Sequence, residues 1–207
     1  MRIVAIGDTH GLHRQVAIPD GDLLVHAGDL TRGGNLDELP DFVDWIDSLP
    51  HTHKIVIAGN HDWCFQRQPN RARWLLAGCT YLQDQAITLD GITFYGSPWQ
   101  PWFHDWAFNL RPGVEIAAKW ELIPAGVDVM VTHGPPYGHG DRTWHGEDAG
   151  CRDLMAAVAR VRPRMHIFGH IHEGAGRSED TSTVYVNASC CDLYYAAVNP
   201  PIVLDLA

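Results

Sequence analysis

The chain has 207 residues, of which 45% are hydrophobic, and a formal net charge of −10. This length and hydrophobic content fill the core of one domain without help from disulfides, so we expect residues 1–207 to form a single domain. The negative charge argues against a long nucleic acid as partner, because polyanions select basic surfaces, whereas a small phosphorylated molecule stays compatible if bound cations reverse the local potential.

Five short runs of β-branched and apolar residues predict buried strands. Each run is ended by Gly, Asp, Asn or His, and the runs begin at Ile3, Leu23, Ile55, Val129 and His166. Helical spacing of apolar residues predicts helices over residues 36–49 and 148–161. Strands that alternate with helices are typical of an α/β domain.

Two further stretches predict antiparallel pairing. The segment around Asp90 and Gly91 has the alternating apolar residues and the turn dipeptide of a β-hairpin. The C-terminal part carries two strand-like runs, at residues 183–189 and 202–206, with no helical pattern between them. We therefore expect a second, partly antiparallel sheet.

The five buried strands of the alternating pattern end in residues of the types that bind metal ions. These residues are Asp8 and His10, then Asp29, then Asn60 and His61, then His133, and finally His170 and His172. Ligands of open α/β sheets bind beyond the carboxyl ends of the strands, so these side chains can converge. Asp, Asn and Gly after a strand are also ordinary turn residues, but turn propensity does not explain the histidines. The pattern therefore predicts a metal site.

Five short motifs, in this order, resemble those of the calcineurin-like metallophosphoesterases. They are D-x-H at residues 8–10, G-D at 28–29, G-N-H-D at 59–62, H-G at 133–134 and G-H-x-H at 169–172. Longer strings resemble a narrower branch, the small metallophosphoesterase-domain-containing proteins related to class III cyclic-nucleotide phosphodiesterases. These strings cover residues 95–109, 133–141 and 168–176. The resemblance implies a two-sheet α/β/β/α sandwich.

The resemblance also implies ligands for two divalent metal ions. The first ion would take Asp8, His10 and His172, the second would take Asn60, His133 and His170, and Asp29 would bridge the two. Carboxylate, imidazole and amide ligands suit manganese, iron or zinc, of which we expect manganese first, whereas magnesium and calcium prefer oxygen alone. Two ions about 3.5–4 Å apart acidify a bridging water, which then attacks the phosphate.

His61 has no place in that ligand set. By the resemblance it is the general acid that protonates the leaving alkoxide, with Asn60 and Asp29 beside it, and an imidazole suits this role near neutral pH. Phosphoprotein phosphatases read G-D-x-x-D-R-G where this chain has Arg32 in place of the second Asp. The carboxylate that would orient His61 is missing, so Asp62 or a backbone carbonyl would substitute for it. The loss counts against phosphoprotein substrates.

Tryptophans and arginines near the motifs are candidates for contacts with the substrate. Trp99 and Trp102 have rings that either stack on a nucleobase or aryl group or pack beneath their own loop as a small core. Arg32, Arg142 and Arg177 lie near motifs and are candidates for binding phosphate, although arginine on a polar loop is more often solvated.

Three functions fit these observations to different degrees. We predict a phosphodiesterase acting on small diesters, such as cyclic nucleotides or aryl phosphodiesters. A phosphomonoesterase acting on nucleotides or sugar phosphates would use the same ions. A non-catalytic binding module is the third alternative, because a fold does not dictate activity. The filled ligand positions and the presence of His61 count against it.

The N-terminal residues and the cysteines favour a cytoplasmic protein. Asp8 interrupts the first apolar run, so no secretory leader is recognisable, and no stretch approaches the roughly 18 apolar residues of a membrane span. The five cysteines are odd in number and lack C-x-x-C spacing. We expect no membrane partner, and the oligomeric state stays open.

Overall fold

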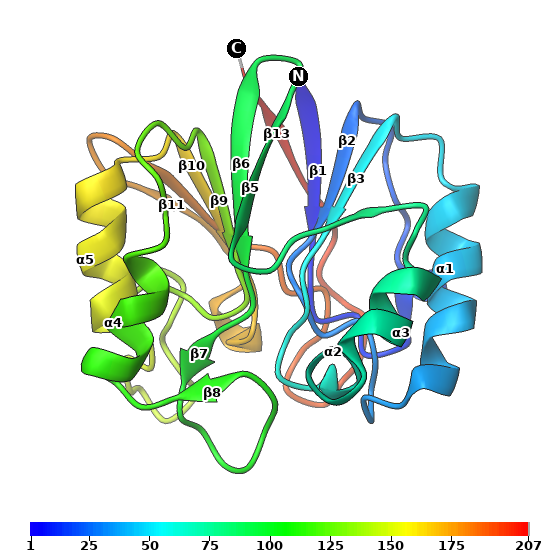
Figure 1. Ribbon diagram of the computed structural model, residues 1–207, viewed down its shortest axis with the longest axis horizontal. Coiled ribbons are helices and arrows are strands. Elements are labelled where there is room, and N and C mark those ends of the chain that lie inside the picture. The colour runs from blue at the N-terminus through cyan, green and yellow to red at the C-terminus, as the bar shows by residue number, and fades with distance from the viewer. Residues whose placement is uncertain (207) are drawn as a thin grey trace.

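The protein, described over residues 1–206 by a computed structural model, contains two large β-sheets packed face to face (Figure 1). Helices cover the outer face of each sheet, so the layers follow the order helix, sheet, sheet, helix. This arrangement confirms the predicted α/β class and the α/β/β/α sandwich.

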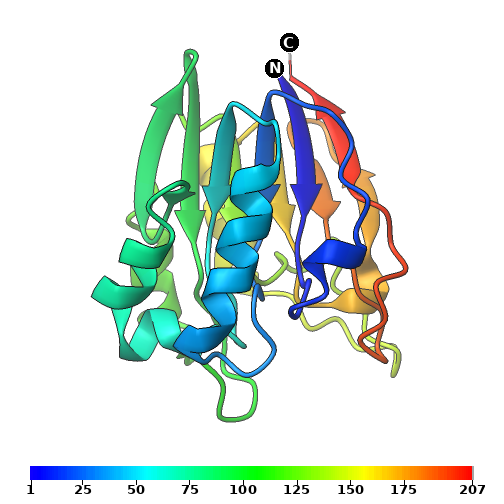
Figure 2. The same ribbon diagram turned by 90° about the vertical axis from the view of Figure 1, so that its right-hand side faces the viewer.

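The first sheet has the strand order β13-β1-β2-β3-β4. Its strands are β1 (Arg2–Ile6), β2 (Leu23–His26), β3 (His53–Val56), β4 (Thr80–Tyr81) and β13 (Ile202–Asp205). All neighbours pair in parallel except β13, which runs antiparallel to β1. Its outer face carries α1 (Leu39–Ser48), α2 (Trp63–Arg67) and α3 (Pro69–Leu75). Figure 2 shows α1 lying along this face.

The second sheet has the order β11-β12-β10-β9-β6-β5, with antiparallel pairs at both edges. Its strands are β5 (Gln85–Leu89), β6 (Ile92–Ser97), β9 (Val129–Thr132), β10 (Met165–Phe168), β11 (Gly176–Glu179) and β12 (Val184–Asn187). Its outer face carries α4 (Val114–Trp120) and α5 (Arg152–Val161). The remaining elements are the ribbon of β7 (Gln100–Pro101) and β8 (Asn109–Leu110) and the 3-10 helices η1 (His13–Gln15), η2 (Leu36–Glu38) and η3 (His172–Gly174).

Alternation along the strands builds three apolar layers. In β1, Val4 packs toward the helices while Ile3 packs toward the second sheet. In β9, Val129 belongs to the layer between the sheets while Met130 belongs to the layer under α4 and α5. Because both faces of these strands are buried, their sequences are continuous apolar runs rather than alternating ones.

Both predicted helices form, but each begins later than predicted. Residues Leu36–Glu38 form the 3-10 helix η2 before α1 begins, and Asp148 and Cys151 make isolated bridges before α5 begins. Helices α2, α3 and α4 were not predicted, because five to seven residues hold too little apolar periodicity. Within residues 1–206, no helix has both the length and the apolarity to cross a bilayer.

The carboxyl ends of the parallel strands lie opposite the labelled chain ends (Figures 1 and 2). Strands β1, β2 and β3 of the first sheet end there, and so do β9 and β10 of the second. The five strand ends singled out by the sequence therefore come from two sheets, and their loops meet across the seam between them.

Gly96 lies in β6 and faces Ile57 and Leu82, which follow β3 and β4 of the first sheet. A Cβ on this residue would overlap the Cβ of Leu82 and lie 2.9 Å from Cγ2 of Ile57. The Leu82 Cβ cannot rotate away, so we expect Gly96→Ala to lower the free energy of unfolding by about 1–3 kcal/mol in urea denaturation. Thr88→Ala, at an exposed position of the same hairpin, should change it by less than about 0.5 kcal/mol. Equal stability of the two variants would contradict this prediction.

Candidate metal centre

The seven residues predicted as metal ligands lie together at the carboxyl ends of the two sheets. Asp8 and His10 follow β1, Asp29 follows β2, Asn60 follows β3, His133 follows β9, and His170 and His172 follow β10. The first four come from the first sheet and the last three from the second, so the cluster spans the seam between the sheets. Their role as ligands stays a prediction.

Backbone strain is concentrated in this cluster. The φ angles are +50° at Asp8, +44° at His10, +55° at Asp29 and +70° at His170, all in the left-handed region that favours glycine. Such residues cost about 1–3 kcal/mol each and persist where the surrounding structure enforces them. Strain at four residues of one cluster is typical of a functional site.

The carboxylate of Asp29 lies at the centre of the cluster. Its Oδ2 is 3.7 Å from Nε2 of His10 and 3.5 Å from Nε2 of His133. Its Oδ1 accepts a hydrogen bond of 2.8 Å from the backbone N–H of His61. A Cβ at Gly59 would overlap Oδ1, so glycine is required there. One oxygen thus lies between histidines assigned to different ions, as a bridging ligand requires.

Asp8, His10 and His172 form the first group that could hold a metal ion, with ligand atoms within 4.8 Å of one another. The Nε2 atoms of His10 and His172 are 3.2 Å apart, and Nε2 of His172 is 3.6 Å from Oδ1 of Asp8. Ser189 donates its hydroxyl to Oδ2 of Asp8 at 2.6 Å. Nδ1 of His172 donates to the Asp192 carbonyl at 2.9 Å, which leaves Nε2 for the group.

Asn60, His133 and Asp29 surround the second position. Nε2 of His133 lies 2.7 Å from Oδ1 of Asn60, while its Nδ1 donates to the carbonyl of Ala27 at 3.0 Å. This backbone bond fixes Nε2 as the nitrogen that faces the cluster. His170 lies beside this position, with its ring centroid 5.0 Å from that of His133.

The electrostatics of the cluster fit divalent cations. Asp8 and Asp29 are buried, and within residues 1–206 the nearby basic side chains that contact their carboxylates are histidines rather than lysine or arginine. Burial raises the pKa of Asp29 well above its usual range, and it lowers the pKa of His10 to about 2, so that ring is neutral. Burial opposes a charge on His172, but the Asp8 carboxylate raises its pKa to about 9. The cluster therefore favours bound positive charge.

His61 lies at the edge of the cluster with its ring held from several sides. Its Nδ1 donates to the backbone carbonyl of Arg32 at 2.8 Å, which leaves Nε2 as the nitrogen that can exchange a proton. The ring stacks on Trp106, with centroids 4.2 Å apart and an interplanar angle of 29°, and meets His10 edge-on at 4.5 Å. Of the two substitutes considered for the missing carboxylate, the backbone carbonyl is the one in contact.

Within residues 1–206, the hydrogen bonds of the Asp62 carboxylate join two loops rather than reach the His61 ring. Its carboxylate accepts hydrogen bonds from the backbone N–H groups of Leu30, Thr31 and Gly59 at 2.8–3.2 Å. The Thr31 hydroxyl adds a bond of 2.7 Å. These bonds tie the loop after β2 to the loop after β3, so Asp62 sets the spacing between Asp29 and His61.

The two candidate tryptophans have different environments. Trp99 is half-buried, donates its indole N–H to Asp84 at 2.9 Å, and packs against Phe108 and beneath the ammonium of Lys119. For Trp99 the structure therefore supports packing beneath its own loop. Trp102 is 58% exposed and keeps a ring free for stacking, which stays a prediction.

The three candidate arginines have different surroundings, and their binding of phosphate stays a prediction. Arg142 forms an ion pair with Asp148 at 3.5 Å, and Arg177 forms one with Glu179 at 3.1 Å. Arg32 contributes its backbone carbonyl to the site, while the residue itself is exposed.

Three residues that contact the cluster carry no recognisable signal in the sequence. Trp106 lies in the string at residues 95–109, but no local pattern distinguishes it from Trp99 or Trp102. Ser189 and Tyr195 follow β12, in a segment without a recognised motif, and Tyr195 places its ring 4.7 Å from that of His10.

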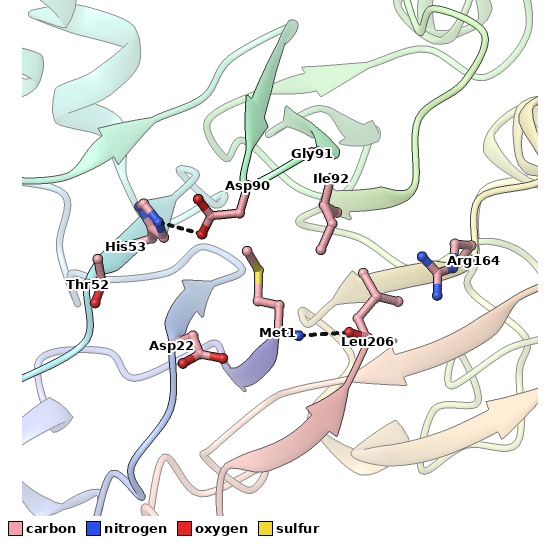
Figure 3. A pocket seen from close by; sticks show the side chains of 9 residues that line it. All are labelled: Met1, Asp22, Thr52, His53, Asp90, Gly91, Ile92, Arg164 and Leu206. Carbon is pink, nitrogen blue, oxygen red and sulfur yellow. Dashed lines mark hydrogen bonds and ion pairs between the residues drawn. The ribbon is translucent and has the colours of Figure 1, made fainter.

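A cavity of about 640 Å³ lies at the other end of the sheets, among the residues drawn in Figure 3. It is lined by residues near the chain ends and by the β5–β6 turn, where Asp90 forms a hydrogen bond of 3.2 Å with His53 of β3. The strained residues and converging ligands lie elsewhere, so the chemistry is placed at the carboxyl ends and not in this cavity.

Comparisons with known proteins agree with this geometry. Residues 1–174 match the family described as Calcineurin-like phosphoesterase. Metallophosphoesterase domain-containing protein 1 of Homo sapiens is 45% identical over 232 aligned positions, which cover 99% of this chain and 71% of that protein.

Solved structures support the fold independently. TT1561 of Thermus thermophilus superposes with a TM-score of 0.60 at 13% identity, covering 90% of this chain and 88% of that one. A solved structure described as a novel archaeal phosphodiesterase gives a TM-score of 0.51 at 16% identity, covering 99% and 100%. At such identities the likeness concerns the fold alone. Because the family match and the human relative both cover most of the sequence, this chain belongs to the calcineurin-like phosphoesterase family.

Proposed function

We propose that this protein is a phosphodiesterase that uses two divalent metal ions, manganese first and iron or zinc as alternatives, to hydrolyse small phosphate diesters. The observation that carries the proposal is the position of Asp29 Oδ2 between Nε2 of His10 and Nε2 of His133. A carboxylate oxygen in this position could serve two ions of the kind that clamp one phosphoryl group.

The proposed ligand sets are those that the resemblance implies. One ion would be held by Asp8, His10 and His172, the other by Asn60, His133 and His170, with Asp29 shared. When bound, such ions activate water and neutralise charge on the phosphoryl oxygens. The backbone carbonyls of Ala27 and Asp192 direct Nε2 of His133 and of His172 toward the cluster.

His61 is proposed as the general acid that transfers a proton from Nε2 to the leaving oxygen. The Arg32 carbonyl accepts the Nδ1 hydrogen, so the ring cannot present Nδ1 to the substrate. Trp106 stacks on one face of the ring and limits its rotation. A positioned imidazole of this kind contributes about 10²–10⁴-fold to a rate.

The distribution of charge supports a diester over a monoester. Arg142 and Arg177 form ion pairs with Asp148 and Glu179, which leaves the exposed Arg32 as the candidate arginine for the second negative charge of a monoester. The exposed ring of Trp102 suits an aryl group or a nucleobase. The proposed substrate is therefore a small diester such as a cyclic nucleotide or an aryl diester.

We propose that the protein acts in the cytoplasm. The five cysteines are free, as expected in a reducing compartment, and the net charge of −10 disfavours a long nucleic acid as substrate.

Replacement of the bridging carboxylate tests the metal centre. We expect Asp29→Asn to abolish turnover and to lower the metal content toward one ion or none, because a neutral amide weakens both sites. Elemental analysis of the purified variant measures the content directly. A variant that keeps two ions and normal activity would show that the bridge is wrongly assigned.

Replacement of the proposed acid tests the proton transfer. His61→Ala should keep both ions and lower kcat by about 10²–10⁴-fold on a diester with an alkoxide leaving group. The loss should be much smaller on a nitrophenyl diester, because nitrophenolate leaves without protonation. Equal losses on the two substrates would remove His61 from this role.

Trp106→Leu provides a matched comparison for the ring that holds His61. Trp106→Leu should lower kcat more on the diester with an alkoxide leaving group than on the nitrophenyl diester, because His61 stays present but loses its stacking partner. Trp106→Phe should restore much of the lost kcat on the alkoxide diester. A variant that slows both substrates equally would instead indicate general damage to the site.

A substrate screen tests the class of ester. Manganese-loaded protein should hydrolyse a bis-aryl phosphate with a higher kcat/KM than the matching aryl monophosphate at the same pH. The reverse order would favour a phosphomonoesterase. Two ions bound without turnover of either substrate, or of 2′,3′- and 3′,5′-cyclic nucleotides, would favour a binding module.

A further inference from the structure

Tyr195, in the segment after β12, lies directly against the candidate metal centre. Its ring centroid is 4.7 Å from that of His10, 5.6 Å from that of His172 and 6.0 Å from that of His61, with steep interplanar angles in each case. One phenol ring therefore adjoins two proposed metal ligands and the proposed general acid.

The loop holds Tyr195 in a conformation that a bulky residue rarely adopts, with φ at +59°. Asp192 enforces this turn, since its Oδ1 accepts hydrogen bonds of 2.9 Å from the backbone N–H groups of Tyr194 and Ala196. The carbonyl of Asp192 accepts the Tyr195 N–H at 3.0 Å and Nδ1 of His172 at 2.9 Å. The turn that presents Tyr195 is thus also the one that orients a proposed ligand.

The hydroxyl of Tyr195 is available to a bound molecule. Within residues 1–206 the hydrogen bonding of Tyr195 runs through its backbone N–H, and the residue keeps 38% of its surface exposed. A tyrosine phenol is protonated at neutral pH, because its ordinary pKa is about 10. A neutral donor therefore stands at the edge of the centre.

We propose that the Tyr195 hydroxyl donates a hydrogen bond to a phosphoryl oxygen of the substrate, on the side of the centre formed by His10 and His172. This inference rests on the proposed function, because the phosphoryl group must lie over the cluster and next to His61. A neutral donor suits the single negative charge of a diester, and it strengthens its bond as charge develops in the transition state.

The experiment compares Tyr195→Phe with Tyr194→Phe. The first change removes one hydroxyl and keeps the ring against His10, and the second removes the hydroxyl of the neighbouring tyrosine, which is 89% exposed. Calorimetry measures the binding of inorganic phosphate to each manganese-loaded protein, and elemental analysis confirms the metal content. We expect Tyr195→Phe to raise the Kd for phosphate, and to lower kcat/KM for a bis-aryl diester, by about 10-fold or more. Tyr194→Phe should match the wild type.

The outcomes separate this inference from the proposed function. Unchanged phosphate affinity and kcat/KM in Tyr195→Phe would overturn it, and so would loss of metal ions, which would mean that Tyr195 serves the ligands instead. A wild type that binds no phosphate overturns it as well. If the wild type hydrolyses no ester but Tyr195→Phe still weakens phosphate binding, the proposed function fails while the phosphate contact stands.

Discussion

The buried carboxylate of Asp29 is the group on which the rest of the site depends. It follows β2 of the first sheet, yet one of its oxygens lies 3.5 Å from His133, which follows β9 of the second sheet. Burying a carboxylate costs several kcal/mol unless it is compensated. The backbone N–H of His61 compensates part of this cost, and the remainder makes the site suited to a bound cation. The electrostatics of the centre therefore depend on the packing of the two sheets, because separating the sheets would separate the groups around this oxygen.

The same dependence explains why strain collects at this end of the molecule. Asp8, His10, Asp29, His170 and Tyr195 all have positive φ, and each lies one to a few residues beyond a strand or in the loop against the centre. Apolar layers cover both faces of the central strands. The packed strands hold the loops in conformations that the loops alone would not adopt. The free energy gained by packing the apolar layers thus offsets the cost of the strained backbone that positions these polar side chains.

The sequence predicts the parts of the structure that local pattern determines. The apolar runs predict the strands, the Asp-Gly dipeptide predicts the hairpin, and the polar residues at the strand ends are brought together as expected. The sequence does not predict the starts of α1 and α5 or the short helices α2 to α4, since their apolar periods are brief. It also misses Trp106 and Tyr195, because those contacts depend on where a loop returns in space and not on neighbours in the chain. The carbonyl that orients His61 could not be chosen in advance, because every residue carries one.

That carbonyl has an electrostatic consequence for the proposed reaction. A carboxylate at residue 32 would place a formal negative charge behind His61, in a protein whose net charge is already −10. The Arg32 carbonyl instead supplies a dipole, which fixes the tautomer of the ring without adding charge beside an anionic substrate. The hydroxyl of Tyr195 is likewise a neutral group at the edge of the centre. The Arg32 carbonyl accepts the hydrogen bond that positions His61, and the Tyr195 hydroxyl is the proposed donor to the substrate. Neither group adds a formal charge to the site. This arrangement suits the ester with one negative charge that we propose as the substrate.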